Sequence, residues 1–236
     1  MTGVDVGFRL PVGMLPDICL LCDLPADSVP NLCAGCAGSL PRLEGAKSTR
    51  VVAFRYELPV STLIHWMKFE ANLPAAFTLG VLLAERVAEA LTAVGTPWPD
   101  AIVPVPLHRA RLRARGFNQS LELARPVSRR LGLPLLTDSC LRTRATEPQS
   151  SLASDTQRRR NVADAFRVRR PLTGLNRLAI VDDVLTTGAT AGSLARTLRG
   201  AGVRQVMIWA CAGAGQASRL ATDSAFVSMN SRRGST

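Results

Sequence analysis

Short apolar runs alternate with amphipathic stretches along most of this chain. Four runs rich in Val, Ile and Ala predict strands, at residues 51–56, 101–106, 177–183 and 203–212. A helical period predicts helices over 61–69, 74–91, 117–131 and 189–201, and Pro126 is expected to kink the third helix or to begin a second segment. Because strands and helices alternate, we expect an α/β fold, a mostly parallel sheet flanked by helices and joined by right-handed crossovers.

The pattern changes near residue 50. Residues 16–45 lack a long periodic segment and are punctuated by Pro, Gly and Cys, so we interpret them as a separately cored module ahead of an α/β domain at 50–212. Residues 140–163 are polar and indicate a long loop with some helix, and residues 213–236 predict a poorly ordered tail. No apolar run reaches the roughly 18 residues of a spanning helix and no signal peptide is visible, so we expect a cytoplasmic protein without a membrane span.

Four of the six cysteines form two Cys-x-x-Cys pairs, Cys19 with Cys22 and Cys33 with Cys36. Each such turn points two thiolates at a common centre, and two turns supply the four sulfurs of a tetrahedral zinc site. Four protein ligands leave no open coordination position, so the expected Zn²⁺ is structural and the module is a zinc ribbon. A redox-active pair or a site that has lost its metal are the alternatives.

Composition adds a strong positive charge. Hydrophobic residues make up 47% and charged residues 20% of the chain, which excludes a wholly disordered protein, and the net charge is +11. Residues 101–170 hold 15 arginines and five acidic residues. Guanidinium groups suit the phosphates of a nucleic acid or of a pyrophosphate ligand, although a solvated surface would show the same bias. On a strand or extended loop, the alternating Arg109, Arg111, Arg113 and Arg115 would share one face that could follow a phosphate backbone.

The most informative segment is 180–190, with the sequence IVDDVLTTGAT. An apolar strand runs directly into Asp182 and Asp183, which can accept hydrogen bonds from two vicinal hydroxyls of a ribose. The Thr- and Gly-containing loop that follows leads into a helix, and its N–H groups and hydroxyls can cradle a phosphate. A capped strand–helix turn is the plainer alternative. The segment matches the phosphoribosyl-pyrophosphate (PRPP) signature of type I phosphoribosyltransferases.

Further motifs narrow this similarity. VPVPLHRARLRARGFNQS at 103–120, TEPQSSLASDTQRRRNVADAF at 146–166 and the 180–190 segment occur in this order, behind the four cysteines and the segment HWMK at 65–68. Over roughly residues 16–212 the chain resembles the ComF family. That resemblance implies a phosphoribosyltransferase-like domain behind a zinc ribbon, and a link to natural competence, the uptake of single-stranded DNA.

The resemblance also implies roles for individual residues. Asp182 and Asp183 resemble the family's catalytic, ribose-binding acids. The loop that resembles the family's PRPP 5-phosphate loop consists of Thr186, Thr187, Gly188, Ala189 and Thr190. The segment that resembles its pyrophosphate loop consists of Leu107, His108 and Arg109. Further positions match family motifs without an assigned role: Lys68, Arg115, Asn118, Gln119, Gln149, Arg160 and Asn161. For Asn118 and Gln119, capping of a helix start is the alternative.

The implied reaction displaces pyrophosphate from C1 of PRPP, with Mg²⁺ held largely by ligand oxygens. It needs no covalent nucleophile on the protein, and no nucleobase-recognition element is visible in the sequence. Three functions stay open: a transferase acting on an unidentified acceptor, a non-catalytic PRPP- or nucleotide-binding protein of the DNA-uptake machinery, and an adaptor that binds single-stranded DNA alone. Aromatic residues make up 5% of the chain, which weakens the case for a base-stacking platform.

Overall fold

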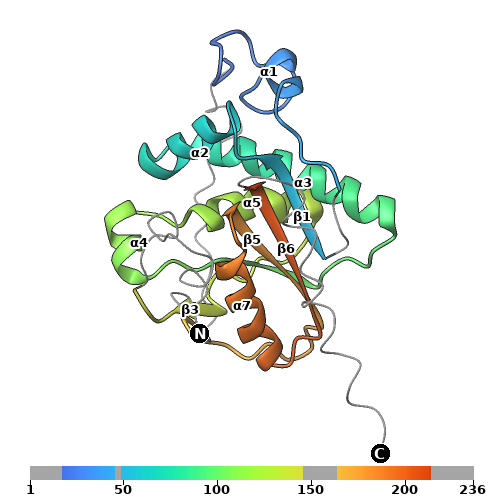
Figure 1. Cartoon of the computed structure of the whole chain (residues 1–236), viewed down its shortest axis with the longest axis vertical. Helices are drawn as coiled ribbons and strands as arrows, with labels where there is room; N and C mark the ends of the chain where they lie inside the picture. The colour runs from blue at the N-terminus through green and yellow to red at the C-terminus, as the bar shows by residue number, and fades with distance from the viewer. Residues whose placement is uncertain (1–17, 46–48, 146–163, 214–236) are drawn as a thin grey trace, which may run out of the picture.

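The computed structural model describes residues 18–45, 49–145 and 164–213 (Figure 1). The helices are α1 (Ala34–Gly38), α2 (Val60–Phe69), α3 (Leu73–Val94), α4 (Arg109–Arg115), α5 (Gln119–Leu131) and α7 (Ala189–Gly200). The strands are β1 (Arg50–Arg55), β2 (Ala101–Pro104), β3 (Cys140–Arg142), β4 (Phe166–Val168), β5 (Arg177–Leu185) and β6 (Gln205–Gly213). Among these helices, none combines the length and the apolar character that crossing a membrane requires.

Four strands form a parallel sheet in the order β1-β6-β5-β2. The central strands β5 and β6 are buried along most of their length, as expected of a sheet covered on both faces. Strands β3 and β4 pair antiparallel in a separate small sheet. The predicted α/β architecture, a parallel sheet flanked by helices, is confirmed.

Alternate residues of the strands divide the core into two halves. One half contains Val181 of β5 and Trp209 of β6, and it packs against α2, α3 and α5. The other half contains Ile180 and Ile208, one residue earlier on the same strands, and it packs against α7 and the β3–β4 sheet. The period of two in the strands therefore places α7 opposite the other three helices (Figure 1).

The cysteine-bearing module rests on the N-terminal half of α3. Leu32 and Leu40 are buried in the same apolar core as the helix. The Asn31 side chain donates to Thr78 Oγ1 at 2.9 Å, and the Thr78 hydroxyl donates to the carbonyl of Pro30 at 2.8 Å. The expectation of a separate core was wrong, because a module this short buries its few apolar residues against the neighbouring helix.

Helices α3 and α5 pack closely against each other at Gly80. A Cβ built on Gly80 would lie 2.3 Å from Pro126 Cγ and 2.6 Å from the carbonyl oxygen of Leu123. Glycine is therefore required for this packing distance. The sequence predicted either a kink or a second segment at Pro126; helix α5 runs through Pro126 as one element, so the second alternative is wrong.

Two other expectations need correction. The segment with alternating arginines is helix α4 rather than a strand or extended loop, so residues four apart share a face, not residues two apart. Arg111 and Arg115 therefore lie on one face, while Arg109 and Arg113 are exposed. Residues 140–142, expected in a loop, form β3 because Phe166–Val168 pairs with them.

Candidate functional site

A cavity of about 300 Å³ opens at the carboxyl ends of β2 and β5. Helix α5 leads from β2 toward the outer edge of the sheet, where Leu135 forms a parallel bridge to Ile102, whereas α7 leads from β5 toward β6 on the opposite face. The chain thus departs in opposite directions from these two neighbouring strands. Crevices at such switch points are where open α/β sheets bind ligands.

Asp182 lines the cavity and is 8% exposed. Its Oδ1 accepts hydrogen bonds from the Ser120 hydroxyl at 3.1 Å and from the backbone N–H of Asp183 at 3.0 Å. Burial, and then the neighbouring charge of Asp183, raise the pKa of Asp182 to about 7. The carboxyl group therefore titrates near neutral pH, and ligand hydroxyls that donate to it would stabilise its charged form.

Asp183 is the partner of a buried lysine. Lys68 Nζ, in the last turn of α2, lies 2.8 Å from Asp183 Oδ2, and less than one fifth of either side chain is exposed. Burial lowers the pKa of Lys68, but the charges of Asp183 and Asp182 outweigh burial and raise it overall. The two acids therefore differ: within the described part of the chain, Asp183 has a dedicated counter-ion and Asp182 does not.

The loop after β5 also lines the cavity. Thr186, Thr187, Gly188, Ala189 and Thr190 all line it. Gly188 has φ +72°, a left-handed conformation that glycine adopts without strain, and it is the N-cap of α7. Thr187 Oγ1 accepts from the N–H of Ala189 at 3.3 Å, which holds the turn. The first turn of a 12-residue helix thus faces the cavity, as a phosphate site requires.

Basic side chains from two elements that are separate in sequence line the same cavity. Arg111 and Arg115 reach it from α4, and Arg142, 7% exposed, reaches it from β3. Burial, and then the charge of Arg111, lower the pKa of Arg142 to about 10. Arg115 also lies over the ring of Phe69, 5.6 Å from its centroid. The cavity therefore has a cationic wall in addition to the loop at 186–190.

The start of α5 supplies the remaining predicted residues. Asn118 caps the helix, accepting from the N–H of Ser120 at 3.1 Å, and its Nδ2 donates to the carbonyl of Val105 at 3.1 Å. For Asn118 the capping interpretation is thus confirmed. Gln119 is different: it lines the cavity, it is 2% exposed and its Nε2 has no hydrogen-bond partner among the described residues.

The residues proposed for the pyrophosphate loop do not all reach the cavity. Leu107 lines it. His108 instead caps α4, where its Nδ1 accepts from the N–H of Ala110 at 3.3 Å. Arg109 is exposed on α4 and is not part of the cavity wall. Gln149, Arg160 and Asn161 lie outside the described residues.

Sequence reasoning missed Ser120 and Arg142 as individual site residues. Ser120 stands inside the quoted 103–120 motif, so its position next to Asn118 was the available signal. Arg142 is one arginine among 15 in its region, and only the pairing of β3 with β4 distinguishes it.

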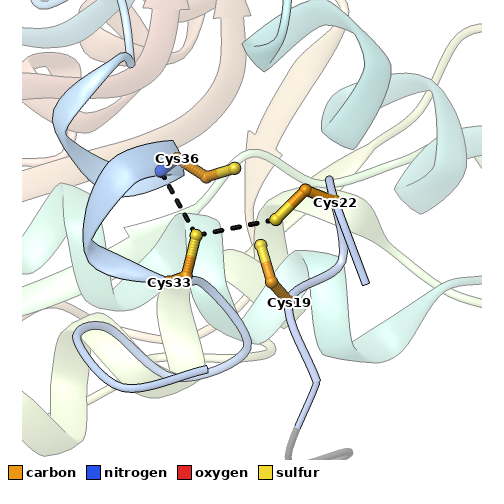
Figure 2. A group of neighbouring side chains, drawn as sticks. All are labelled: Cys19, Cys22, Cys33 and Cys36. Atoms are coloured by element: carbon orange, nitrogen blue, oxygen red, sulfur yellow. Dashed lines mark hydrogen bonds between the residues drawn. The ribbon is translucent and has the colours of Figure 1, made fainter. Parts of the chain in front are cut away.

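The four cysteines form the second candidate site. Figure 2 shows Cys19, Cys22, Cys33 and Cys36 converging, and their sulfurs all lie within 4.8 Å of one another. Cys22 Sγ and Cys33 Sγ are 3.6 Å apart, close to the roughly 3.8 Å between ligands of a tetrahedral zinc with Zn–S bonds of about 2.3 Å. Contacts with Cys22 and then Cys33 raise the pKa of Cys36 to about 12, because crowded thiols resist ionising together without a cation. The cluster could hold a metal such as zinc.

The chain is similar in sequence to known bacterial proteins. A "DNA utilization protein YhgH" of Salmonella typhi is 37% identical over 193 residues, covering 81% of this chain and 82% of the relative. "Competence protein F" of Haemophilus influenzae is 34% identical over 179 residues, covering 75% of this chain and 78% of the relative. The chain belongs to the ComF family. No family model matches it.

A solved structure with a similar arrangement is the glutamine PRPP amidotransferase of B. subtilis, complexed with ADP and GMP. The similarity has a TM-score of 0.38 and 20% identity, and it covers 58% of this ComF-family chain. The chain spans 26% of the length of that enzyme.

Proposed function

We propose that the cavity at the carboxyl ends of β2 and β5 binds PRPP or a related ribose phosphate. The observation that supports this most is the placement of Asp182 and Asp183 directly beside the first turn of α7, within one cavity. Hydroxyl acceptors and a phosphate loop within one cavity suit the two functional ends of a ribose 5-phosphate. We therefore orient the ligand with its phosphate at the loop and its ribose hydroxyls at the two acids.

In the proposed complex, the 5-phosphate lies on residues 186–190 and receives N–H groups from the start of α7. The ribose hydroxyls donate to Asp182 and Asp183. Lys68 neutralises Asp183, which keeps two adjacent acids compatible with an anionic ligand. Mg²⁺ would accompany the ligand, since one carboxylate is paired with Lys68 and the pKa of the other is raised.

We further propose phosphoribosyl transfer as the activity of this site. The acceptor's nitrogen would form a bond to C1 and release its proton to solvent, while the C1–oxygen bond to pyrophosphate breaks and the bonding electrons leave with the pyrophosphate. The bound Mg²⁺ would stabilise that departing charge. The protein's part is positioning, by the loop at 186–190 and by Asp182 and Asp183.

The names of the relatives suggest a role in the use or uptake of DNA. Arg109 and Arg113, exposed on α4, favour direct contact with single-stranded DNA as a second function. We place the protein in the cytoplasm, because the cysteines of the described residues are all unbridged. The Zn²⁺ proposed for the cysteine cluster is structural, since its four ligands leave no open position.

Thermal melting with ribose 5-phosphate tests the orientation. Ribose 5-phosphate should raise the melting temperature, ribose alone should not, and Thr190→Val should reduce the rise. Thr197→Val, on the same helix but bonded to the Ser193 carbonyl, is the matched control and should behave as the parent. Equal responses of the two variants would contradict the phosphate assignment. Release of pyrophosphate from PRPP in the presence of nitrogen acceptors then distinguishes transfer from binding alone.

A further inference from the structure

The acid pair at the end of β5 has the composition of a divalent-cation site. Asp182 and Asp183 both line the cavity, and carboxylate oxygens are the ligands that Mg²⁺ takes in proteins. A metal ion that accompanies a phosphorylated ligand could therefore bind to these two acids, or it could be held by ligand oxygens alone. The contacts of the two carboxyl groups distinguish these arrangements.

Three of the four carboxylate oxygens of the pair already have partners. Asp182 Oδ1 accepts hydrogen bonds from Ser120 and from the N–H of Asp183. Asp183 Oδ1 accepts from the N–H of Val184 at 2.6 Å, and Asp183 Oδ2 lies 2.8 Å from Lys68 Nζ. Asp182 Oδ2 is thus the one oxygen of the pair without a hydrogen-bond or ion-pair partner among the described residues. The two acids together leave a metal a single open position.

The ammonium group of Lys68 stands where a metal ion would have to bind. Mg²⁺ requires ligand oxygens at about 2.0–2.1 Å in a near-octahedral arrangement. A metal ion on Asp183 Oδ2 would therefore lie directly beside an ammonium group that contacts the same oxygen, and the two cations would repel each other. The acid pair does not fit a metal ion while Lys68 is in place.

The fold fixes the lysine in this position. Lys68 belongs to the last turn of α2, where the free carbonyl groups of a helix favour a positive charge. The next residue, Phe69, lies under the guanidinium group of Arg115, which connects the end of α2 to α4. Less than one fifth of the Lys68 side chain is exposed, so the ammonium group has little access to water as an alternative partner.

We infer that Lys68 takes the place of a metal ion at the acid pair, so that this chain binds the ribose hydroxyls without a divalent cation. The inference rests on the proposed function and deepens it, because it assigns a positioning role to Lys68 and restricts Mg²⁺ to ligand oxygens. It also means that the two acids are a latent metal site, which opens when the ammonium group is removed.

An ammonium group and a metal ion differ in what they demand of the site. Both offset the charge of two adjacent acids and so reduce their repulsion of a ligand phosphate. Mg²⁺ gives up its water reluctantly and occupies carboxylate oxygens that the ribose hydroxyls need. The ammonium group occupies one oxygen of Asp183 and leaves Asp182 Oδ2 open to a hydroxyl donor.

Calorimetry of ribose 5-phosphate binding to the full chain tests the metal requirement. Buffers prepared without divalent cations are compared with the same buffers containing Mg²⁺, and no chelator is added, because a chelator would also remove metal from the cysteine cluster. The dissociation constant of the parent should change by about twofold or less. Lys68→Met should weaken metal-free binding roughly 10- to 100-fold, and Mg²⁺ should restore most of the loss. Lys68→Arg, which keeps the charge, should stay independent of metal.

Electron paramagnetic resonance with Mn²⁺ alone tests the latent site without any ligand. Lys68→Met should bind one Mn²⁺ per chain with a dissociation constant on the order of 1 mM or tighter, and adding Asp183→Asn should abolish this binding. The parent should bind no Mn²⁺ at the acid pair. Arg130→Met is the matched control, since it breaks the 3.1 Å ion pair with Glu85, and it should behave as the parent in both experiments.

The outcomes separate this inference from the proposed function. If ribose 5-phosphate binds neither with nor without Mg²⁺, the proposed function fails and the inference fails with it. If the parent binds ribose 5-phosphate only with Mg²⁺, or binds Mn²⁺ at a site that Asp183→Asn removes, the ribose phosphate site stands and the role of Lys68 is refuted. A folded Lys68→Met variant that neither binds Mn²⁺ nor responds to Mg²⁺ also refutes it. Melting temperatures are measured for every variant, and if Lys68→Met does not fold, a metal requirement in the parent or in Lys68→Arg decides against the inference.

Discussion

Asp182 and Asp183 are neighbours in sequence, yet their replacement by asparagine should change stability in opposite directions. In the described part of the chain, Asp182 is buried without a basic partner of its own, whereas Asp183 forms the 2.8 Å ion pair with Lys68. Removing the charge of Asp182 removes the free-energy cost of burying an ionised carboxylate on folding. Removing the charge of Asp183 leaves the ammonium group of Lys68 facing a neutral side chain.

The effect at Asp182 depends on pH. Its pKa is raised from 3.8 to about 7, so the folded protein holds a proton that the unfolded chain releases between about pH 4 and about pH 7. Stability therefore falls as pH rises through this window, and above it the ionised carboxylate costs on the order of 4 kcal/mol. An asparagine side chain at this position would accept the same two hydrogen bonds without ionising. We expect Asp182→Asn to gain about 1–3 kcal/mol near pH 8, or roughly 3–9 °C.

The effect at Asp183 has the opposite sign. Breaking a fully buried pair by removing one partner costs about 3–5 kcal/mol. Here both side chains keep some solvent contact and Asp182 can partly replace the lost counter-ion, so we expect Asp183→Asn to lose about 1–3 kcal/mol.

Thermal melts of the ligand-free protein from about pH 5 to about pH 9 measure both effects. The gain of Asp182→Asn should shrink toward pH 5, where the parent carboxyl is already protonated. Glu44→Gln, at an exposed carboxylate, is the control and should melt as the parent. The reasoning is refuted if Asp182→Asn melts below the parent near pH 8, or if its difference from the parent does not vary with pH.

The other predictions concern the cysteine cluster, helix packing and the exposed arginines. Cys36→Ser should lose zinc in metal analysis and lower the melting temperature of the whole chain, because the module shares the core of α3; retained stoichiometric zinc would exclude this ligand. Gly80→Ala should cost about 2–4 kcal/mol in chemical denaturation, because its Cβ would meet Pro126 at 2.3 Å; a neutral result would contradict the packing. The double variant Arg109→Ala and Arg113→Ala should make the slope of log binding constant against log salt concentration shallower by about 1 to 1.5 for oligonucleotides, and should leave ribose phosphate binding unchanged. An unchanged slope would show that neither arginine contacts the oligonucleotide.

Local patterns predicted much of this molecule. The run from an apolar strand into two acids and then a glycine loop predicted β5, the turn and α7, because all the determinants lie within a short stretch. The cysteine spacing predicted the cluster for the same reason. The strand extends to Leu185, past the expected end, since Asp182, Val184 and Leu185 still pair with β6.

Long-range contacts were beyond sequence reasoning. Ser120 and Asp182 are 62 residues apart, and nothing near either residue announces their hydrogen bond. Arg142 enters the cavity only because β4 holds β3 in place. The arginines of α4 were misread because alternation along the chain favours one face of a strand, while the cap at His108 starts a helix that turns Arg111 inward.

Titration of the full chain with PRPP and Mg²⁺ in a calorimeter measures whether the cavity binds this ligand. We expect saturable binding of one PRPP per chain, which the combined Asp182→Asn and Asp183→Asn variant loses while remaining folded. The absence of saturable heat from the parent protein at millimolar PRPP would contradict it.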